Sequence, residues 1–189
     1  RVSYTRAFGD GGACHMSAKL TRKKLAFIGV IIALIAVYFL FIQKPKVEYL
    51  PGSMSGINHV KGTSVNWFKV NGNYAQSAND TCCIMVPRKW TPNQTVLVEW
   101  EVDPNAYPTD SPGVTDPKFD AYMEKHKANY RHYSKVVEIP QYDEPCSMKV
   151  HFLPCQEVKI SLSCYSPWLP EYPIQEPLGM EEPAICPQN

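Results

Sequence analysis

The sequence Thr95-Val-Leu-Val-Glu-Trp-Glu-Val102 shows the clearest alternation of apolar and polar residues in the chain. Every second residue from Val96 to Val102 is apolar, and Glu99 and Glu101 lie between them. Because side chains alternate between the two faces of a strand, this pattern predicts a strand with one face in a core and the other in water. The surrounding segment is therefore expected to form a β-sheet.

Further strands are predicted on both sides of this segment. They cover residues 57–60, 64–70 and 81–86 before it, and residues 134–139, 146–153 and 157–165 after it. The turn Asn71-Gly-Asn73, in which Asn-Gly favours positive φ, ends the second of these strands. In the last strand the even-numbered residues from Val158 to Cys164 share one face, which we expect to face the core.

One amphipathic helix is predicted for residues 117–133. Asp116-Pro117 has the character of an N-cap followed by proline at the first helical position. Six residues then recur at spacings of three and four, and we interpret their stripe as core: Phe119, Tyr122, Met123, His126, Tyr130 and Tyr133. Six or seven strands and one helix predict a mainly β (α+β) fold, an antiparallel β-sandwich-like domain.

An uncharged run from Leu25 to Ile42 precedes this domain. As a helix it would be about 27 Å long, close to the thickness of the hydrocarbon core of a bilayer. Four Lys or Arg residues lie between residues 19 and 24, and only two lysines follow by residue 46. The positive-inside rule then places the amino end in the cytoplasm. The sequence thus predicts a single N-terminal transmembrane helix in the inner membrane.

A cleaved secretory signal peptide stays open as an alternative, because it also has a basic start and an apolar middle. Here the apolar run is longer than the apolar region of a typical signal peptide. It also ends in Tyr38-Phe-Leu-Phe-Ile-Gln43, with bulky residues where a peptidase needs small ones. An uncleaved signal anchor is the favoured interpretation.

The remaining boundaries are drawn from composition. Residues 1–24 are interpreted as a leader or tag followed by a basic cytoplasmic segment, and residues 25–42 as the transmembrane segment. Residues 43–56, with two prolines and two glycines, are predicted to be a linker. Residues 57–189 are predicted to be a single β-rich domain in the periplasm.

The two parts of the chain differ in charge. Residues 1–46 contain eight Lys or Arg and one Asp, whereas residues 47–189 contain eleven Lys or Arg and seventeen Asp or Glu, a net charge of 11 − 17 = −6. Such an acidic domain disfavours nucleic acid or an anionic membrane surface as its partner. From Pro167 onward there are six prolines, four glutamates and no Lys or Arg. This composition predicts an extended acidic strap.

Six of the seven cysteines lie in the outer domain, where an even number predicts a disulfide framework: Cys82, Cys83, Cys146, Cys155, Cys164 and Cys186. A ring closed between the adjacent Cys82 and Cys83 would be strained, so each is expected to pair with a distant cysteine. The sequence leaves the pairing open, and Cys186 is a candidate for fastening the strap.

The residue patterns do not indicate an enzyme, a cofactor or a metal site. No acid/base pair, phosphate loop or nucleophile motif is evident. Gly52-Ser-Met-Ser-Gly56 resembles a hydrolase elbow, but Met54 takes the place of the nucleophilic serine. His126 and His132 are six positions apart on the predicted helix, about 240° round it, and so would not share an ion.

Two other functions stay open. A periplasmic copper carrier could use Cys82 and Cys83, together with the pattern Cys146-x-Met148-x-x-His151, as soft ligands. Neighbouring residues on a strand point to opposite faces, however, which separates Cys82 from Cys83 and Met148 from His151. A structural envelope module is the other alternative.

The sequence Cys82-Cys-Ile-Met-Val-Pro-Arg-Lys-Trp90, with Val70-Asn-Gly72 before it and Thr95–Trp100 after it, carries a family resemblance. It resembles Gram-negative envelope proteins that often contain C-C-x-x-x-P-x-K-W followed by an alternating strand ending in Trp. The match covers residues 56–170. Members are often encoded beside type VI secretion phospholipase effectors, and the family is similar to immunity proteins that neutralise such lipases in the periplasm. The resemblance implies an antitoxin that acts as a lipase inhibitor through protein binding.

An immunity protein needs only a rigid surface that covers an enzyme, and an acidic domain suits a basic effector by charge steering. We expect this surface in the loops 103–116 and 141–145 and in the strap, because irregular segments often carry binding residues. The expected partner-binding residues are Asp103, Tyr107, Asp110, Asp143, Glu144, Trp168 and Glu171. Trp90 is expected to plug one end of the barrel instead.

Overall fold

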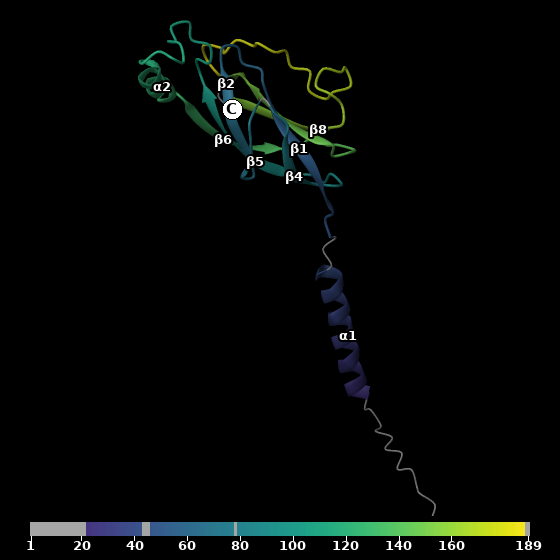
Figure 1. The fold of residues 1–189 in the computed structure, drawn as a ribbon. Helices are drawn as coiled ribbons and strands as arrows, with labels where there is room; N and C mark the ends of the chain where they lie inside the picture. The colour runs from purple at the N-terminus through teal and green to yellow at the C-terminus, as the bar shows by residue number, and fades with distance from the viewer. Residues whose placement is uncertain (1–21, 43–45, 78, 188–189) are drawn as a thin grey trace, which may run out of the picture. The chain divides into compact units, whose positions relative to one another are not determined.

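The structure is a computed structural model, and it describes residues 22–42, 46–77 and 79–187. The chain divides into two compact units, Arg1–Lys46 and Val47–Asn189, which we describe separately. Figure 1 shows α1 in the first unit and all the strands in the second.

The first unit contains the helix α1, Arg22–Ile42, which includes the predicted apolar helix. Its side chains from Arg22 to Phe39 are exposed. Across the described parts of the chain, no helix combines the length and the apolar character that crossing a bilayer requires. The leader predicted at the start of the chain lies outside the described residues.

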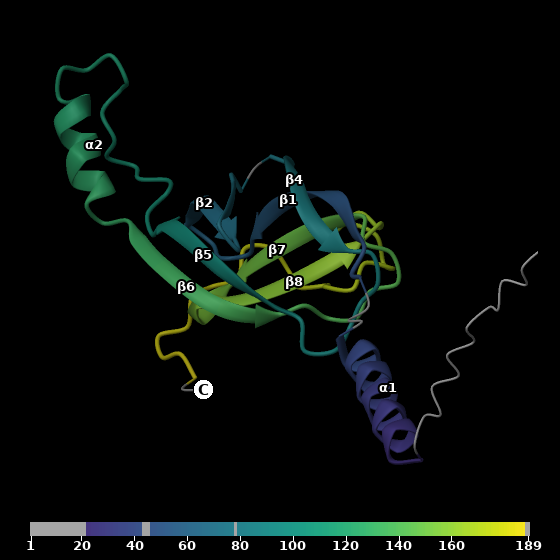
Figure 2. The same ribbon diagram turned by 90° about the horizontal axis from the view of Figure 1, so that it is seen from below.

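The second unit contains two four-stranded sheets, ordered β4-β1-β7-β8 and β3-β2-β5-β6 (Figure 2). The first sheet consists of β1 Tyr49–Asn58, β4 Thr81–Pro87, β7 Ser147–Leu153 and β8 Glu157–Ser163. The second consists of β2 Ser64–Val70, β3 Asn73–Ala75, β5 Thr95–Asp103 and β6 Arg131–Glu138. The mainly β, α+β fold class is thereby confirmed.

The two sheets share one hydrophobic core. β5 contributes Val96, Val98 and Trp100, as its alternation predicted. The ring centroid of Phe152 on β7 lies 5.7 Å from that of Trp100 and 5.5 Å from that of Phe68 on β2. Aromatic contacts of this kind join the two layers across the core.

β8 follows its predicted alternation over most of its length. Val158, Ile160 and Leu162 are buried in the core. Cys164, which was predicted to continue this face, lies one residue beyond the end of β8 and is exposed. That core assignment is wrong because the strand ends before the pattern does.

The predicted linker of residues 43–56 is wrong from Tyr49 onward, since Tyr49–Asn58 forms β1. β1 lies inside its sheet, antiparallel to β4 and parallel to β7, so the sheet is not wholly antiparallel. Its single proline and two glycines give β1 little local strand propensity. Pairing on both sides supplies the stabilisation that the local sequence lacks.

The predicted helix of residues 117–133 is shorter than expected and is not part of the core. α2 spans Phe119–Lys127 and has no buried residue. It ends in a tightened turn, in which the N–H of Tyr130 donates to the carbonyl of Lys127. Tyr133 instead lies on β6, where its ring centroid is 5.5 Å from that of Trp100.

The C-terminal segment is extended, as predicted. From Cys164 to Pro187 the described chain contains no helix or strand, only an isolated bridge between Val60 and Met180. We call residues 164–187 the strap. It crosses the face of the first sheet that points away from the core.

Candidate functional site

The six cysteines of the outer domain form three disulfides: Cys82–Cys83, Cys146–Cys164 and Cys155–Cys186. The expectation that Cys82 and Cys83 pair with distant cysteines is wrong. The peptide bond between them is cis, and their Cα atoms lie 3.1 Å apart.

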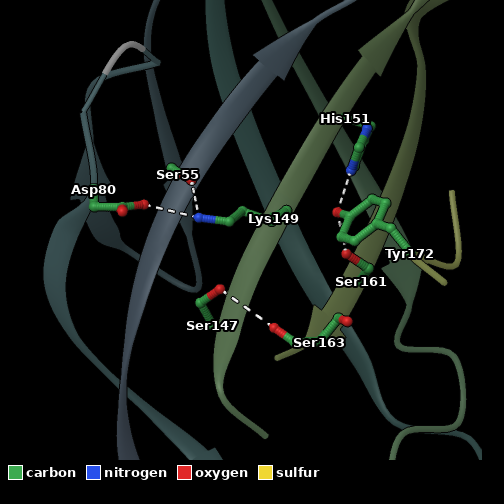
Figure 3. Close-up of polar contacts among 8 residues, drawn as sticks. All are labelled: Ser55, Asp80, Ser147, Lys149, His151, Ser161, Ser163 and Tyr172. Carbon is green, nitrogen blue, oxygen red and sulfur yellow. Dashed lines mark hydrogen bonds and ion pairs between the residues drawn. The ribbon is translucent and has the colours of Figure 1, made fainter. Parts of the chain in front are cut away.

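A chain of four buried side chains fastens the strap to the outer face of the first sheet, and Figure 3 draws three of them, His151, Ser161 and Tyr172. The hydroxyl of Tyr172 on the strap lies 2.5 Å from Oγ of Ser161 and 2.6 Å from Nε2 of His151. Nδ1 of His151 lies 2.8 Å from Nε2 of His59, whose Nδ1 lies 2.9 Å from the carbonyl oxygen of Pro177. The four side chains are at most 3% exposed.

We call the four side chains and the hydrogen bonds that link them the buried hydrogen-bond chain. Neutral groups satisfy every one of these hydrogen bonds. When His59 donates to the carbonyl of Pro177, its Nε2 accepts from His151. His151 in turn accepts from Tyr172, and Tyr172 accepts from Ser161. Burial, followed by the proximity of His59, lowers the pKa of His151 from 6.5 to about 4, which keeps its ring neutral.

The far end of the strap is held by backbone hydrogen bonds and a disulfide. The N–H of Met180 donates to the carbonyl of His59 at 2.7 Å, and the N–H of Lys61 donates to the carbonyl of Met180 at 2.9 Å. Cys186 is bonded to Cys155, which confirms that Cys186 fastens the strap. The strap is thus fixed along its length.

The fixed strap exposes large side chains to solvent. Trp168 is 71% exposed, and Tyr165 and Leu169 are also exposed. Cys146, two residues after Glu144, is bonded to Cys164, the first residue of the strap. Asp143 and Glu144 therefore lie near the beginning of the strap. We define the strap surface as Asp143, Glu144, Tyr165, Trp168, Leu169 and Glu171, all of which are exposed.

Tyr107 and Asp110 are exposed at the opposite end of the strands. The N–H of Ala106 in their loop donates to the carbonyl of Gly62, which follows the end of β1. Cys146, which marks the position of the strap surface, lies just before the start of β7. Because β1 and β7 are parallel, these are opposite ends, separated by about 20 Å along a seven-residue strand. The predicted partner-binding residues therefore form two separate surfaces.

Asp103 belongs to neither surface. Its side chain is buried, with Oδ2 2.8 Å from Nε2 of His126, and Oδ1 accepts from the N–H of Asn105 at 2.9 Å. The prediction that Asp103 contacts a partner is wrong, because its carboxylate is occupied in joining β5 to α2.

A Ser–Lys pair lies on the outer face of the first sheet (Figure 3). Nζ of Lys149 is 2.8 Å from Oγ of Ser55 and 2.9 Å from Oδ1 of Asp80. A Ser–Lys hydrolase needs a lysine that can accept a proton. Here the lysine donates to a carboxylate, and this hydrogen bond lowers the pKa of Asp80. The arrangement holds the segment before β4 in place.

The soft side chains proposed for copper are already engaged. The described residues contain two groups with metal-ligand spacing: Glu144 with Cys146 and Cys164, and Glu182 with Cys155 and Cys186. In both, the cysteines form a disulfide and so offer no thiolate. Met148 lies in the core and His151 in the buried hydrogen-bond chain, which confirms that they occupy opposite faces of β7.

The segment Cys82–Trp90 supports one end of the domain. The carbonyl of Pro87 accepts a hydrogen bond from the hydroxyl of Tyr142 at 2.6 Å. Nε1 of Trp90 donates to the carbonyl of Ile139 at 3.0 Å, and its ring packs against the core. Trp90 is thus partly buried against the core, which agrees with a structural role for this residue.

No sequence pattern directly indicates the buried hydrogen-bond chain, whose histidines are 92 positions apart. The nearest signal is the polar alternation of β7 and β8, which places Lys149, His151, Ser161 and Ser163 opposite the core. That pattern indicates a polar outer face. It does not indicate that the strap covers the face.

These features define a β-rich domain of two sheets with a disulfide-fastened strap. The chain belongs to the family described as protein of unknown function (DUF3304), whose profile matches residues 57–160, more than half of the chain. The matched range includes the segment Cys82–Trp90. No curated protein and no solved structure matches the chain.

Proposed function

We propose that this chain is a membrane-anchored immunity protein whose periplasmic domain binds and neutralises a type VI secretion phospholipase effector without catalysis. The resemblance of Cys82–Trp90 and the adjoining strand to such envelope proteins supports the choice of partner. An inhibitor of this kind acts by occupying a surface of the enzyme.

The observation that carries the proposal is the fixed strap. Exposed aromatic and aliphatic side chains, Trp168 above all, are the residue types that dominate protein interfaces. Two disulfides and the buried hydrogen-bond chain hold the segment that carries them. Such preorganisation reduces the conformational entropy lost on binding. The strap surface therefore supports a protein-binding role.

The proposed location is supported by the cysteines and by the N-terminal sequence. Disulfides persist in oxidising compartments such as the periplasm. The uncharged run Leu25–Ile42 and the basic residues before it favour an anchor in the inner membrane. Tethering would keep the domain where an injected lipase attacks.

A topology experiment tests the location. A reporter that is active only outside the cytoplasm, fused after Asn189, is expected to be active, and the chain should sediment with membranes. Activity of only a cytoplasmic reporter at the same site would contradict the location.

Coexpression with a lipase tests the function. A type VI secretion phospholipase effector is sent to the periplasm with or without the full chain, and survival and copurification are measured. Protection and a stable complex are expected. Trp168→Ala should weaken both, whereas Tyr107→Ala, an equally exposed aromatic at the other end, serves as the matched control. Absence of a complex and of protection would overturn the proposal.

A further inference from the structure

The strap is attached to the sheets through very little buried surface. Of the strap residues that the structure describes, 164–187, only Tyr172 is buried. These residues form no helix and no strand. Segments with few buried apolar contacts open at a lower free energy than the core of a protein does. The attachment of the strap therefore depends on a small number of contacts around Tyr172.

The two ends of the strap are attached covalently. Cys164 is bonded to Cys146, just before β7, and Cys186 is bonded to Cys155, just after β7. Residues 165–185 thus form a loop whose ends stay beside the first sheet even when its middle leaves. The contacts between these two ends are noncovalent.

The buried contacts of this loop converge on His59 and His151. The hydroxyl of Tyr172 lies 2.6 Å from Nε2 of His151, as Figure 3 shows. The carbonyl oxygen of Pro177 lies 2.9 Å from Nδ1 of His59, and the N–H of Met180 donates to the carbonyl of His59 at 2.7 Å. The two rings thus hold the middle of the strap from below.

Two ion pairs also join the strap to the sheets. They are Lys159–Glu176 and Lys61–Glu181, and their side chains are at least 30% exposed. Ion pairs in contact with water contribute little to stability. Release of the strap is therefore controlled by the two buried rings.

The contact between the two rings has room for one hydrogen. Nε2 of His59 and Nδ1 of His151 lie 2.8 Å apart, and both rings are buried. One nitrogen must donate and the other must accept. If each ring carried its full set of protons, two N–H groups would point at each other across this distance. The closed strap is therefore incompatible with protonation of both rings.

No carboxylate compensates a positive charge at this contact. The charged groups that face it are Lys149 on β7, Lys159 on β8 and Glu176 on the strap. Glu176 is engaged with Lys159, and among the described residues no carboxylate bonds to either ring. Burial raises the pKa of Tyr172, which stays neutral. An unpaired buried charge is costly, so protonation disfavours the closed strap.

The closed and the open strap therefore differ in the protons they bind. In the closed strap, burial followed by the proximity of His59 lowers the pKa of His151 from 6.5 to about 4. An open strap leaves this ring in water, where a histidine keeps a pKa near 6.5. The open form thus binds more protons below pH 6.5. Closure is favoured above this pH and is lost progressively as the pH falls toward 4.

We propose that the contact between His59 and His151 is an acid-sensitive latch. Protonation of both rings separates Tyr172 from His151 and releases residues 165–185 as a loop, while the disulfides keep its ends in place and the two sheets stay folded. Because the loop is tethered at both ends, a return to neutral pH closes the latch again.

The latch controls the strap surface. Tyr165, Trp168, Leu169 and Glu171 of that surface lie in the released loop, so opening removes the preorganisation that favours binding. The statement that acid weakens the binding of a lipase rests on the proposed function. The opening of the strap itself does not.

Amide hydrogen exchange of the full chain tests the release. The Met180 amide reports on the strap because it bonds to His59, and the amide of Val98, buried on β5, reports on the sheets. Protection is the measured rate relative to the intrinsic rate at the same pH. Between pH 7 and 4.5, protection of Met180 should fall about 50-fold for uptake of one proton, and further for two, whereas Val98 stays protected. Unchanged protection of Met180, or equal losses at both amides, would overturn the proposal.

Titration of the histidine rings is a second measurement on the unmodified chain. The ring resonances of His59 and His151 are assigned by replacing each in turn. We expect both rings to become protonated over the same pH range in which Met180 loses protection, since the closed strap holds one hydrogen between them. Protonation of both rings while Met180 stays protected would contradict the latch.

Variants separate titration from fastening. His59→Gln combined with His151→Gln keeps a donor and an acceptor at each position but removes both titrating rings, so protection of Met180 should change less than about twofold over this pH range. Tyr172→Phe is the matched control. It keeps both rings, and should lower protection at every pH while retaining the pH dependence. A double variant with the full pH dependence would refute the latch, and if that variant does not fold, the ring titration decides.

Two outcomes distinguish the latch from the proposed function. Release of the strap by acid in a chain that forms no lipase complex would support the latch and contradict the immunity function. A lipase complex formed by a chain whose strap protection is independent of pH would do the reverse. If both are correct, the complex should dissociate faster at pH 4.5 than at pH 7, and the double variant should reduce this difference.

Discussion

Gly56 lies where the backbone of β1 passes directly against two aromatic rings of the core. A Cβ atom at this position would lie 2.9 Å from Cε1 of Phe68 and 3.1 Å from Cε2 of Phe152. Both distances are shorter than ordinary van der Waals contact. Glycine is therefore needed here for space.

Gly56→Ala is expected to lower the free energy of unfolding by about 1–3 kcal/mol, because the rings must move in a packed core. Gly113→Ala is the matched control, since nothing lies within 4 Å of its added Cβ. Urea unfolding at constant pH, with the disulfides intact, measures both. Equal free energies of unfolding for the two variants would show that the two rings can move without destabilising the core.

His151 makes the stability of the domain depend on pH. Its pKa is lowered from 6.5 to about 4 by burial and by His59, so in this pH range the unfolded chain binds a proton that the folded chain does not. Stability should therefore fall as the pH drops through this window, by up to about 3 kcal/mol. Unfolding midpoints between pH 7.5 and 4 measure the slope.

His151→Gln, which retains a donor and an acceptor, should flatten this slope. Nearby charges, Lys149 and Lys159 on the two strands and Glu176 on the strap, also face His151 and remain in the variant. If the His151→Gln variant kept the full pH dependence of stability, that dependence would arise from other groups.

At the scale of elements, the strap is stabilised by contacts distant in sequence. The disulfide Cys155–Cys186 closes a loop over 31 positions, whereas Cys82–Cys83 joins neighbours. In the chain-entropy account a longer closed loop restricts the unfolded chain more. The two disulfides should thus differ widely in their effect on stability.

Replacing Cys155 and Cys186 by serine should lower the free energy of unfolding by about 3–4 kcal/mol. It should also speed hydrogen exchange of the Met180 amide, which bonds to His59. Cys82→Ser with Cys83→Ser is the control and should have a much smaller effect on global stability. Slow exchange at Met180 in the first variant would mean that the noncovalent contacts alone hold the strap.

At the scale of the whole molecule, the charge of residues 47–189 is −6, from eleven Lys or Arg and seventeen Asp or Glu. Several of the acidic groups lie on the strap surface, while Asp110 lies at the opposite end of the strands. Long-range steering acts on association rates and weakens with salt. The position of each charge then decides its effect on a given interface.

Reversal of Asp143, Glu144 and Glu171 to lysine should slow association with a basic effector at low salt, roughly tenfold, and less at high salt. Asp110→Lys, at the opposite end, should have a smaller effect. Stopped-flow or surface-based kinetics measure both. An unchanged rate for the triple variant would favour a hydrophobic contact through Trp168 as the basis of binding.

The sequence by itself determined the elements whose patterns are local. Alternation was sufficient for β5 and for most of β8, because each of these strands has one face against the core. Cysteine number predicted the disulfide framework, and proline and glutamate content predicted the strap.

Tertiary structure decided what depends on partners far along the chain. β1 has a proline and two glycines where a strand prefers branched residues, and its pairing with β4 and β7 makes it a strand. Asp103 is buried because His126 meets it, and His151 is buried because Tyr172 covers it. Such contacts leave no periodic signal, since their free energy arises only when separate segments are brought together and shielded from water.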